Sequence, residues 1–212
     1  WQKEAMKAFA TLLLLIVSVA QAAEGARLYD EDFSKTSFGR TPAGWQDLTR
    51  LRPSRNWAVD AQGALRQTIK NHAGLLIYAG YTLQPKPATS LADARIEAVF
   101  TKTEDETVSF GIAGRVQDAA NCYLARFSGT RRLELLRMKD GVMTSLDAVP
   151  LPDLKERRET GRISLRPYRM GERWTLSLTL EKNRLTALVR DAEGREQARI
   201  GALDDSFAKG SP

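Results

Sequence analysis

From residue 24 onward, apolar and polar residues alternate over short stretches, which are separated by Gly, Asp, Asn and Pro. Successive side chains of a β-strand point to opposite faces, so this alternation predicts strands with one buried face. The stretch 94–102 is an example, with Ile96, Ala98 and Phe100 on one face and Arg95, Glu97 and Val99 on the other. A helical period is hard to find anywhere in this part of the chain.

The pattern predicts about a dozen antiparallel strands of ordinary length. Asp140-Gly141, between two strand-like runs, is a strong hairpin signal, and Ala61-Gln62-Gly63 is a second turn. The charged segment 153–159 is predicted as a short helix or a loop. No repeat of fixed period is present, which disfavours a propeller or a solenoid. We therefore predict an all-β, antiparallel β-sandwich, with strands at 28–33, 56–60, 64–69, 74–78, 94–102, 107–115, 122–127, 132–138, 142–148, 173–181, 184–190 and 196–200.

The N-terminal region has the pattern of a bacterial secretory signal peptide. Lys3 and Lys7 precede the apolar stretch 8–20, and Ala20-Gln21-Ala22 is a small-x-small cleavage motif. The stretch is shorter than the roughly 20 residues that cross a membrane, which argues against an anchor. We predict a signal helix in residues 1–22, of which 1–5 form an upstream extension, and a mature domain of residues 23–212 in the periplasm or outside the cell.

Composition fits a single soluble domain. Hydrophobic residues make up 42% of the chain and charged residues 27%, so a core is available without disulfides. Cys122 is the one cysteine, and its place in a strand-like run predicts a buried side chain rather than a reactive thiol. The net charge of +6 is spread over the chain without a lysine-rich run or an aromatic and basic stripe, so nucleic acid is not a predicted partner.

Four polar residues in the middle of the chain form the best candidate binding patch: Arg115, Asn121, Tyr123 and Arg126. Arginine and asparagine donors bridge sugar hydroxyls or a carboxylate, and a tyrosine ring stacks on the apolar face of a sugar. The alternative interpretation is a turn, 117–121, flanked by charges at strand edges. The patch predicts a carbohydrate as the partner.

Catalytic and metal chemistry is poorly supported. His72 is the single histidine, which excludes a site of several His ligands, but a loop position leaves it as a candidate ligand-binding residue. No Ser, His and acid arrangement indicates a triad. The acidic cluster 104–106 is predicted to be a hairpin turn, which cannot hold two carboxylates at a fixed separation. No catalytic residue is predicted.

Several segments, in this order, resemble the concanavalin A-like lectin and glucanase superfamily, in particular laminin-G-like domains of bacterial exported proteins, including 3-keto-disaccharide hydrolase domains. The strongest are Gly111 to Arg126 and Leu133 to Gly141. Supporting segments are 30–33, 42–45, 57–60, 63–65, 174–178 and 205–207. The chain departs from the family at Cys122, where an aromatic residue is common, and in the length of the charged run 155–159.

The resemblance implies a jelly-roll sandwich that handles carbohydrate. A non-catalytic glycan-binding module is the first interpretation. A hydrolase of the 3-keto-disaccharide type is the alternative, although the Glu-x-Asp-x-x-Glu motif of laminarinase-type relatives is missing. The resemblance also implies a last strand beyond the Gly-rich end. Some relatives use a structural calcium ion, for which Asp30 and Asp32 would supply oxygen ligands.

Overall fold

The fold is taken from a computed structural model of the chain. The predicted signal segment, Asp30 and His72 lie outside the residues that the structure describes. Most of the strand predicted at 28–33 also lies outside them, and its last two residues, Asp32 and Phe33, lie in a loop. No helix long and apolar enough to span a membrane occurs in the described part of the chain. That part comprises residues 32–43, 45–47, 57–67, 76–78, 92–101, 109–118, 120–128, 132–151, 155–157, 163–165 and 171–210.

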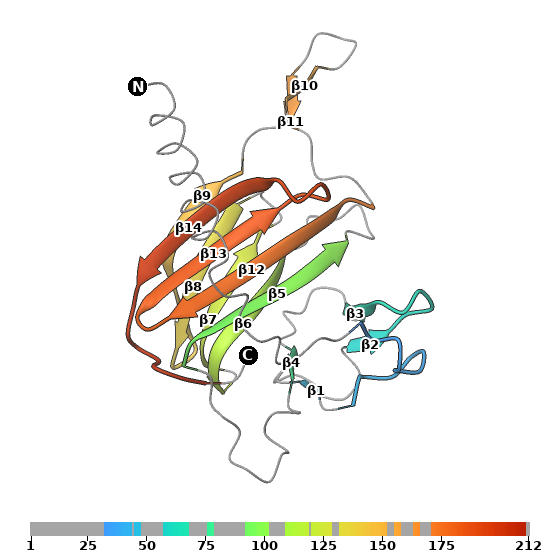
Figure 1. The fold of residues 1–212 in the computed structure, drawn as a ribbon, viewed down its shortest axis with the longest axis horizontal. Coiled ribbons are helices and arrows are strands. Elements are labelled where there is room, and N and C mark those ends of the chain that lie inside the picture. The colour runs from blue at the N-terminus through green and yellow to red at the C-terminus, as the bar shows by residue number, and fades with distance from the viewer. Residues whose placement is uncertain are drawn as a thin grey trace, which may run out of the picture.

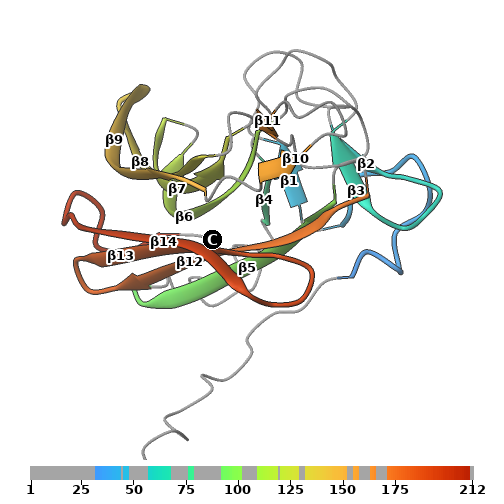
Figure 2. The same ribbon diagram turned by 90° about the horizontal axis from the view of Figure 1, so that it is seen from above.

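Two antiparallel four-stranded sheets stack face to face, which confirms the predicted all-β sandwich (Figures 1 and 2). One sheet has the order β6-β7-β8-β9 and the other the order β14-β13-β12-β5. The strands of the first sheet are β6 (Phe110–Asp118), β7 (Asn121–Phe127), β8 (Arg132–Lys139) and β9 (Val142–Pro150). Those of the second are β5 (Ala94–Thr101), β12 (Arg173–Glu181), β13 (Arg184–Arg190) and β14 (Glu196–Leu203).

Alternation along the strands builds the core between the sheets. In β12, Trp174, Leu176, Leu178 and Leu180 are buried and face the other sheet. The sheets approach so closely that a Cβ added to Gly114 would lie 2.6 Å from Cδ1 of Leu180. The predicted faces of β5 are confirmed. Ile96, Ala98 and Phe100 pack against the core, and the residues between them are exposed.

Six short strands form three two-stranded ribbons outside the main sheets. They are β1 (Trp45–Asp47) with β4 (Leu76–Tyr78), β2 (Trp57–Val59) with β3 (Leu65–Gln67), and β10 (Lys155–Arg157) with β11 (Ile163–Leu165). The hairpin across residues 61–63 is confirmed by the pairing of β2 with β3. The prediction of a helix or loop at 153–159 is wrong for residues 155–157, which pair with β11.

The two ends of the sandwich differ in chemistry. At one end, Phe100, Phe110, Phe127 and Trp174 form a chain of ring contacts with centroid separations of 4.3, 4.9 and 5.4 Å. At the other end, the segment 204–210 leaves β14 and contacts β8, β7 and β6 in turn. One end is therefore packed by aromatic rings, and the other is tied across both sheets by polar contacts.

Candidate ligand-binding site

Arg115 and Tyr123, two of the predicted patch residues, lie inside the sandwich. The Arg115 side chain is 1% exposed and donates to the carbonyl oxygens of Ala92 at 2.6 and 2.8 Å and of Phe207 at 3.0 Å. Its φ of 48° falls where the register between β6 and β7 shifts, so the chain turns this side chain away from the outer face. Arg115 thus joins β6 to the two segments beside it.

Tyr123 is fully buried and belongs to a polar network at the same end. Its hydroxyl donates to Oδ1 of Asp204 at 2.5 Å and accepts from the backbone N–H of Phe207 at 3.1 Å. Arg137 donates to the other carboxylate oxygen of Asp204 at 2.8 Å and to the Ser206 hydroxyl at 3.1 Å. Burial and the hydrogen bond to Asp204 raise the pKa of Tyr123 to about 12, so the hydroxyl keeps its proton. This network holds the segment 204–210 against β7 and β8.

Asn121 links two neighbouring turns. Its Nδ2 donates to the carboxylate of Asp118 at 3.0 and 3.1 Å, and its Oδ1 accepts from the backbone N–H of Asp140 at 2.9 Å. These contacts are those expected from the alternative interpretation of residues 117–121 as a turn.

Arg126 differs from the other three because its side chain is on the outer face of the β6–β9 sheet. Its Nε donates to Oε2 of Glu134, directly opposite on β8, at 2.6 Å. Its Nη1 approaches the sulfur of Met143, an exposed residue of β9, at 4.0 Å. The side chains of Arg126 and Glu134 are 38% and 16% exposed. We call these three residues the outer-face site.

The outer-face site keeps polar atoms available. Among the described residues, Nη2 of Arg126 and Oε1 of Glu134 have no hydrogen-bond partner. Arg126 is partly exposed and Glu134 is mostly buried, so the pair lies between exposed ion pairs, which contribute about 0.2–1 kcal/mol to stability, and buried ones. A donor and an acceptor beside an apolar side chain can hydrogen-bond adjacent hydroxyls while the methionine contacts carbon.

The predicted calcium ligands are only partly within the described residues. Oδ1 of Asp32 accepts from the backbone N–H of Ser34 at 2.9 Å, and the hydrogen bonds from Ser34 lower the pKa of Asp32. In the described ranges, no group of three or more His, Cys, Asp or Glu side chains is suited to hold a metal ion. The calcium site and the role of His72 stay predictions.

Sequence reasoning missed Glu134 and placed Trp57 incorrectly. Glu134 lies directly opposite Arg126 in the pairing of β7 with β8, and the short connection between the strands predicted at 122–127 and 132–138 carried the signal for this pairing. Both Trp57 and Trp174 lie in alternating stretches of the sequence, which predicts that their rings fill the space between the two sheets. Trp174 does so at 4% exposure, whereas Trp57 belongs to the separate β2–β3 ribbon.

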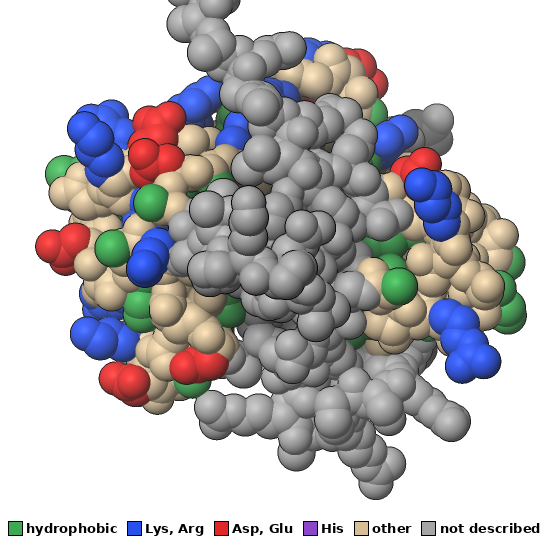
Figure 3. Space-filling view, turned by 60° about the horizontal axis from the view of Figure 1, so that its bottom comes forward, with side chains coloured by type: hydrophobic (Ala, Val, Ile, Leu, Met, Phe, Trp, Pro, Cys, Tyr) green, Lys and Arg blue, Asp and Glu red, His purple; other side chains and the backbone are tan. Residues whose placement is uncertain are grey.

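The described surface mixes both signs of charge, and Figure 3 shows Lys and Arg side chains interspersed with Asp and Glu on one face.

Comparison with known proteins gives a match to a solved structure but not to a family model or a curated sequence. No family model matches the chain, and no curated protein sequence matches it. Among solved structures, a carbohydrate-binding module, CBM66 from Bacillus subtilis, is similar with a TM-score of 0.55 and 15% identity, over 82% of this chain and 88% of that chain. At that identity, the likeness establishes a shared β-sandwich fold.

Proposed function

We propose that this chain is an exported, non-catalytic carbohydrate-binding domain of the concanavalin A-like type, and that the outer-face site binds its glycan. The Arg126–Glu134 pair, whose arginine is partly exposed beside Met143, is the observation on which this proposal depends. The likeness in fold to the CBM66 module supports it, because that protein has the same kind of sandwich and binds carbohydrate. The binding roles predicted for the buried Arg115 and Tyr123 are not needed in this proposal.

The charges of the pair suit a neutral or weakly charged sugar. Hydrogen bonds to ionised groups are stronger than those between neutral groups, and the pair offers both a donor and an acceptor. Removing a charge-assisted hydrogen bond costs about 1.5–3 kcal/mol, which corresponds to roughly a ten- to hundredfold loss of affinity. Arg126→Ala should show a loss of this size.

The test is a glycan array, followed by affinity electrophoresis of the full chain in gels that contain the retained polysaccharides. Arg95→Ala is the matched control, since Arg95 forms an arginine–glutamate pair with Glu97 at 2.7 Å on the outer face of the other sheet, although that pair is more exposed. We expect Arg126→Ala to lose retention and Arg95→Ala to keep it. Equal retention of the two variants would exclude the outer-face site, and a wild-type chain that no glycan retains would exclude the function.

Hydrolysis of a modified disaccharide is the alternative prediction. The arrangement of Arg126 and Glu134 supports binding rather than hydrolysis, because a single carboxylate lies there, whereas glycoside hydrolysis commonly uses two. A reducing-sugar assay that includes oxidised disaccharides separates the two functions. Turnover by the wild-type chain would favour the alternative.

A further inference from the structure

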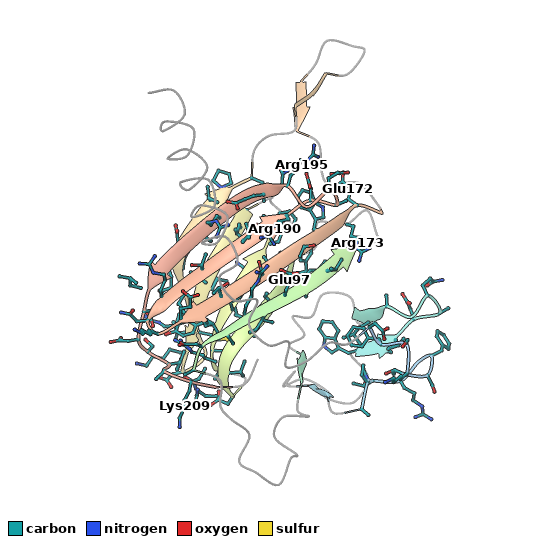
Figure 4. All side chains as sticks on the ribbon, viewed as in Figure 1. Glu97, Glu172, Arg173, Arg190, Arg195 and Lys209 are labelled. Atoms are coloured by element: carbon teal, nitrogen blue, oxygen red, sulfur yellow. The ribbon has the colours of Figure 1, made fainter. Side chains whose placement is uncertain are left out.

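Two polar atoms at the aromatic end of the sandwich are buried without a hydrogen-bond partner. They are Oε2 of Glu172, just before β12, and the indole Nε1 of Trp174, at the second position of the strand. Figure 4 shows Glu172 and Arg173 at the end where β12 begins, far from Lys209 at the other end. Glu172 directly precedes the strand and Trp174 is two residues further along the chain, so their Cα atoms lie at most about 7 Å apart.

Buried polar atoms without a hydrogen-bond partner, like these two, are unusual in a folded protein. Most buried polar side-chain atoms in proteins have a partner, and an exception calls for an explanation. Trp174 is 96% buried because its ring stacks on Phe127, but this contact makes no use of the indole N–H. At the opposite end of the sandwich, the Tyr123 hydroxyl both donates and accepts, whereas Nε of Arg137 is also buried without a partner.

The chemistry of the pair defines what would satisfy it. The indole N–H needs an acceptor, whereas the carboxylate oxygen needs a donor. A hydroxyl group supplies both functions. An anion would be repelled by Glu172, and an ammonium group offers no acceptor to Trp174.

We propose that Glu172 and Trp174 form a second ligand site, distinct from the outer-face site, which takes a neutral polyhydroxyl ligand such as a sugar ring. The indole N–H donates to one ligand hydroxyl, and the Glu172 carboxylate accepts from the same or the adjacent hydroxyl. Because both protein atoms are shielded from solvent, ligand entry requires a local rearrangement at this end of the sandwich.

The direct test follows the indole N–H signals of the ¹⁵N-labelled full chain by NMR. The neutral probes are D-glucose, D-galactose, D-mannose and glycerol, and sodium D-glucuronate is the anionic counterpart. We expect the Trp174 signal to shift with at least one neutral probe and to reach saturation. The glucuronate concentration needed for the same shift should be at least ten times higher. Trp57, whose buried indole also has no partner, is the internal control and should not shift.

Two conservative variants connect the response to the proposed atoms. Trp174→Phe removes the N–H and keeps an aromatic ring for stacking, and Glu172→Gln keeps the shape and removes the charge. Both should weaken probe binding at least tenfold, measured by the backbone amide shifts of β12. Trp57→Phe should have no effect. Arg126→Ala should also leave this response unchanged, so failure here and failure of the outer-face site are distinguishable.

A bound water molecule is the competing occupant, since water also donates and accepts. A cross-peak between the Trp174 indole proton and a long-lived water that persists at saturating probe would overturn the proposal. A Trp174 signal that none of the four neutral probes shifts would overturn it as well, and this readout does not depend on any variant folding.

Discussion

Replacing Tyr123 by Phe tests whether the polar network holds the segment 204–210 in place. The substitution removes one oxygen atom and keeps the ring, which packs edge-on against Phe207 at 5.1 Å. It deletes the hydrogen bond to Asp204 and leaves the backbone N–H of Phe207 without its acceptor. We expect the variant to fold and to be less stable.

The size of the loss follows from these two contacts. A hydrogen bond to a charged group contributes about 1.5–3 kcal/mol, and a buried donor left unsatisfied costs about 1–3 kcal/mol. Part of this is offset because phenylalanine is easier to bury than tyrosine. The expected loss is therefore about 2–4 kcal/mol, a large share of the 5–15 kcal/mol that is typical of a folded domain.

Urea denaturation followed by circular dichroism measures this loss as a lower midpoint at an unchanged slope. Amide hydrogen exchange should become faster in the variant mainly in residues 204–210. A double-mutant cycle with Asp204→Asn isolates the Tyr123–Asp204 contact and should give a coupling of at least about 1 kcal/mol. A loss below about 0.5 kcal/mol, or exchange that rises equally in all strands, would refute the argument.

The pH dependence supplies an independent check. Burial raises the pKa of Asp204, but the hydrogen bonds from Tyr123 and Ser206 and the charge of Arg137 together bring it below its ordinary value. A lowered folded pKa stabilises the protein above the unfolded value of about 4, and this stability is lost as the pH falls through the folded value. Tyr123→Phe removes one of the lowering bonds, so the variant should lose this stabilisation at a higher pH than the wild type.

Two further predictions concern Cys122 and the leader. Burial, followed by the charge of Asp118, raises the pKa of the Cys122 thiol to about 11, so the folded chain should not react with Ellman's reagent at pH 8, whereas the urea-unfolded chain should release one equivalent of product. Rapid labelling of the native protein would contradict the buried position. Cleavage after Ala22 should give a mature protein that begins at Ala23, which N-terminal sequencing of the exported product checks, and an uncut product in the periplasm would contradict the predicted signal peptide.

The strands of the second sheet could be predicted closely from the sequence. The bounds of β12 and β13 match the predicted ranges, and those of β5 differ by one residue. The alternation is complete in β12, whereas β13 contains the apolar run 187–189, and β14 extends to Leu203, beyond its predicted end at residue 200. The pattern fails at β10, where Lys155–Arg157 contains only charged residues. A strand made only of charged residues has no hydrophobic period to detect.

The candidate site was less predictable, because the predicted patch combined residues whose side chains point to opposite faces of one strand. Tyr123 and Arg126 are three residues apart in one strand, so their side chains fall on opposite faces. Tyr123 shares its face with Ala125 and Phe127, which already indicates the core side. The burial of Arg115 could not be predicted in this way, because a local register shift and a positive φ determine the direction of its side chain. These backbone irregularities are not visible in a pattern of residue types.

The contacts made by each polar group then separate structural from functional candidates. Arg115 and Tyr123 direct their polar atoms to backbone or side-chain partners inside the protein. Arg126 keeps part of its hydrogen-bonding capacity unused, and the indole of Trp174 has no partner. A group whose hydrogen bonds are made within the fold has little to offer a ligand without losing them. We therefore expect Tyr123→Phe to lower stability with little effect on glycan affinity, and Arg126→Ala to lower affinity with a smaller loss of stability than Tyr123→Phe. If both variants changed stability and affinity in proportion, the separation between a structural network and a binding face would be wrong.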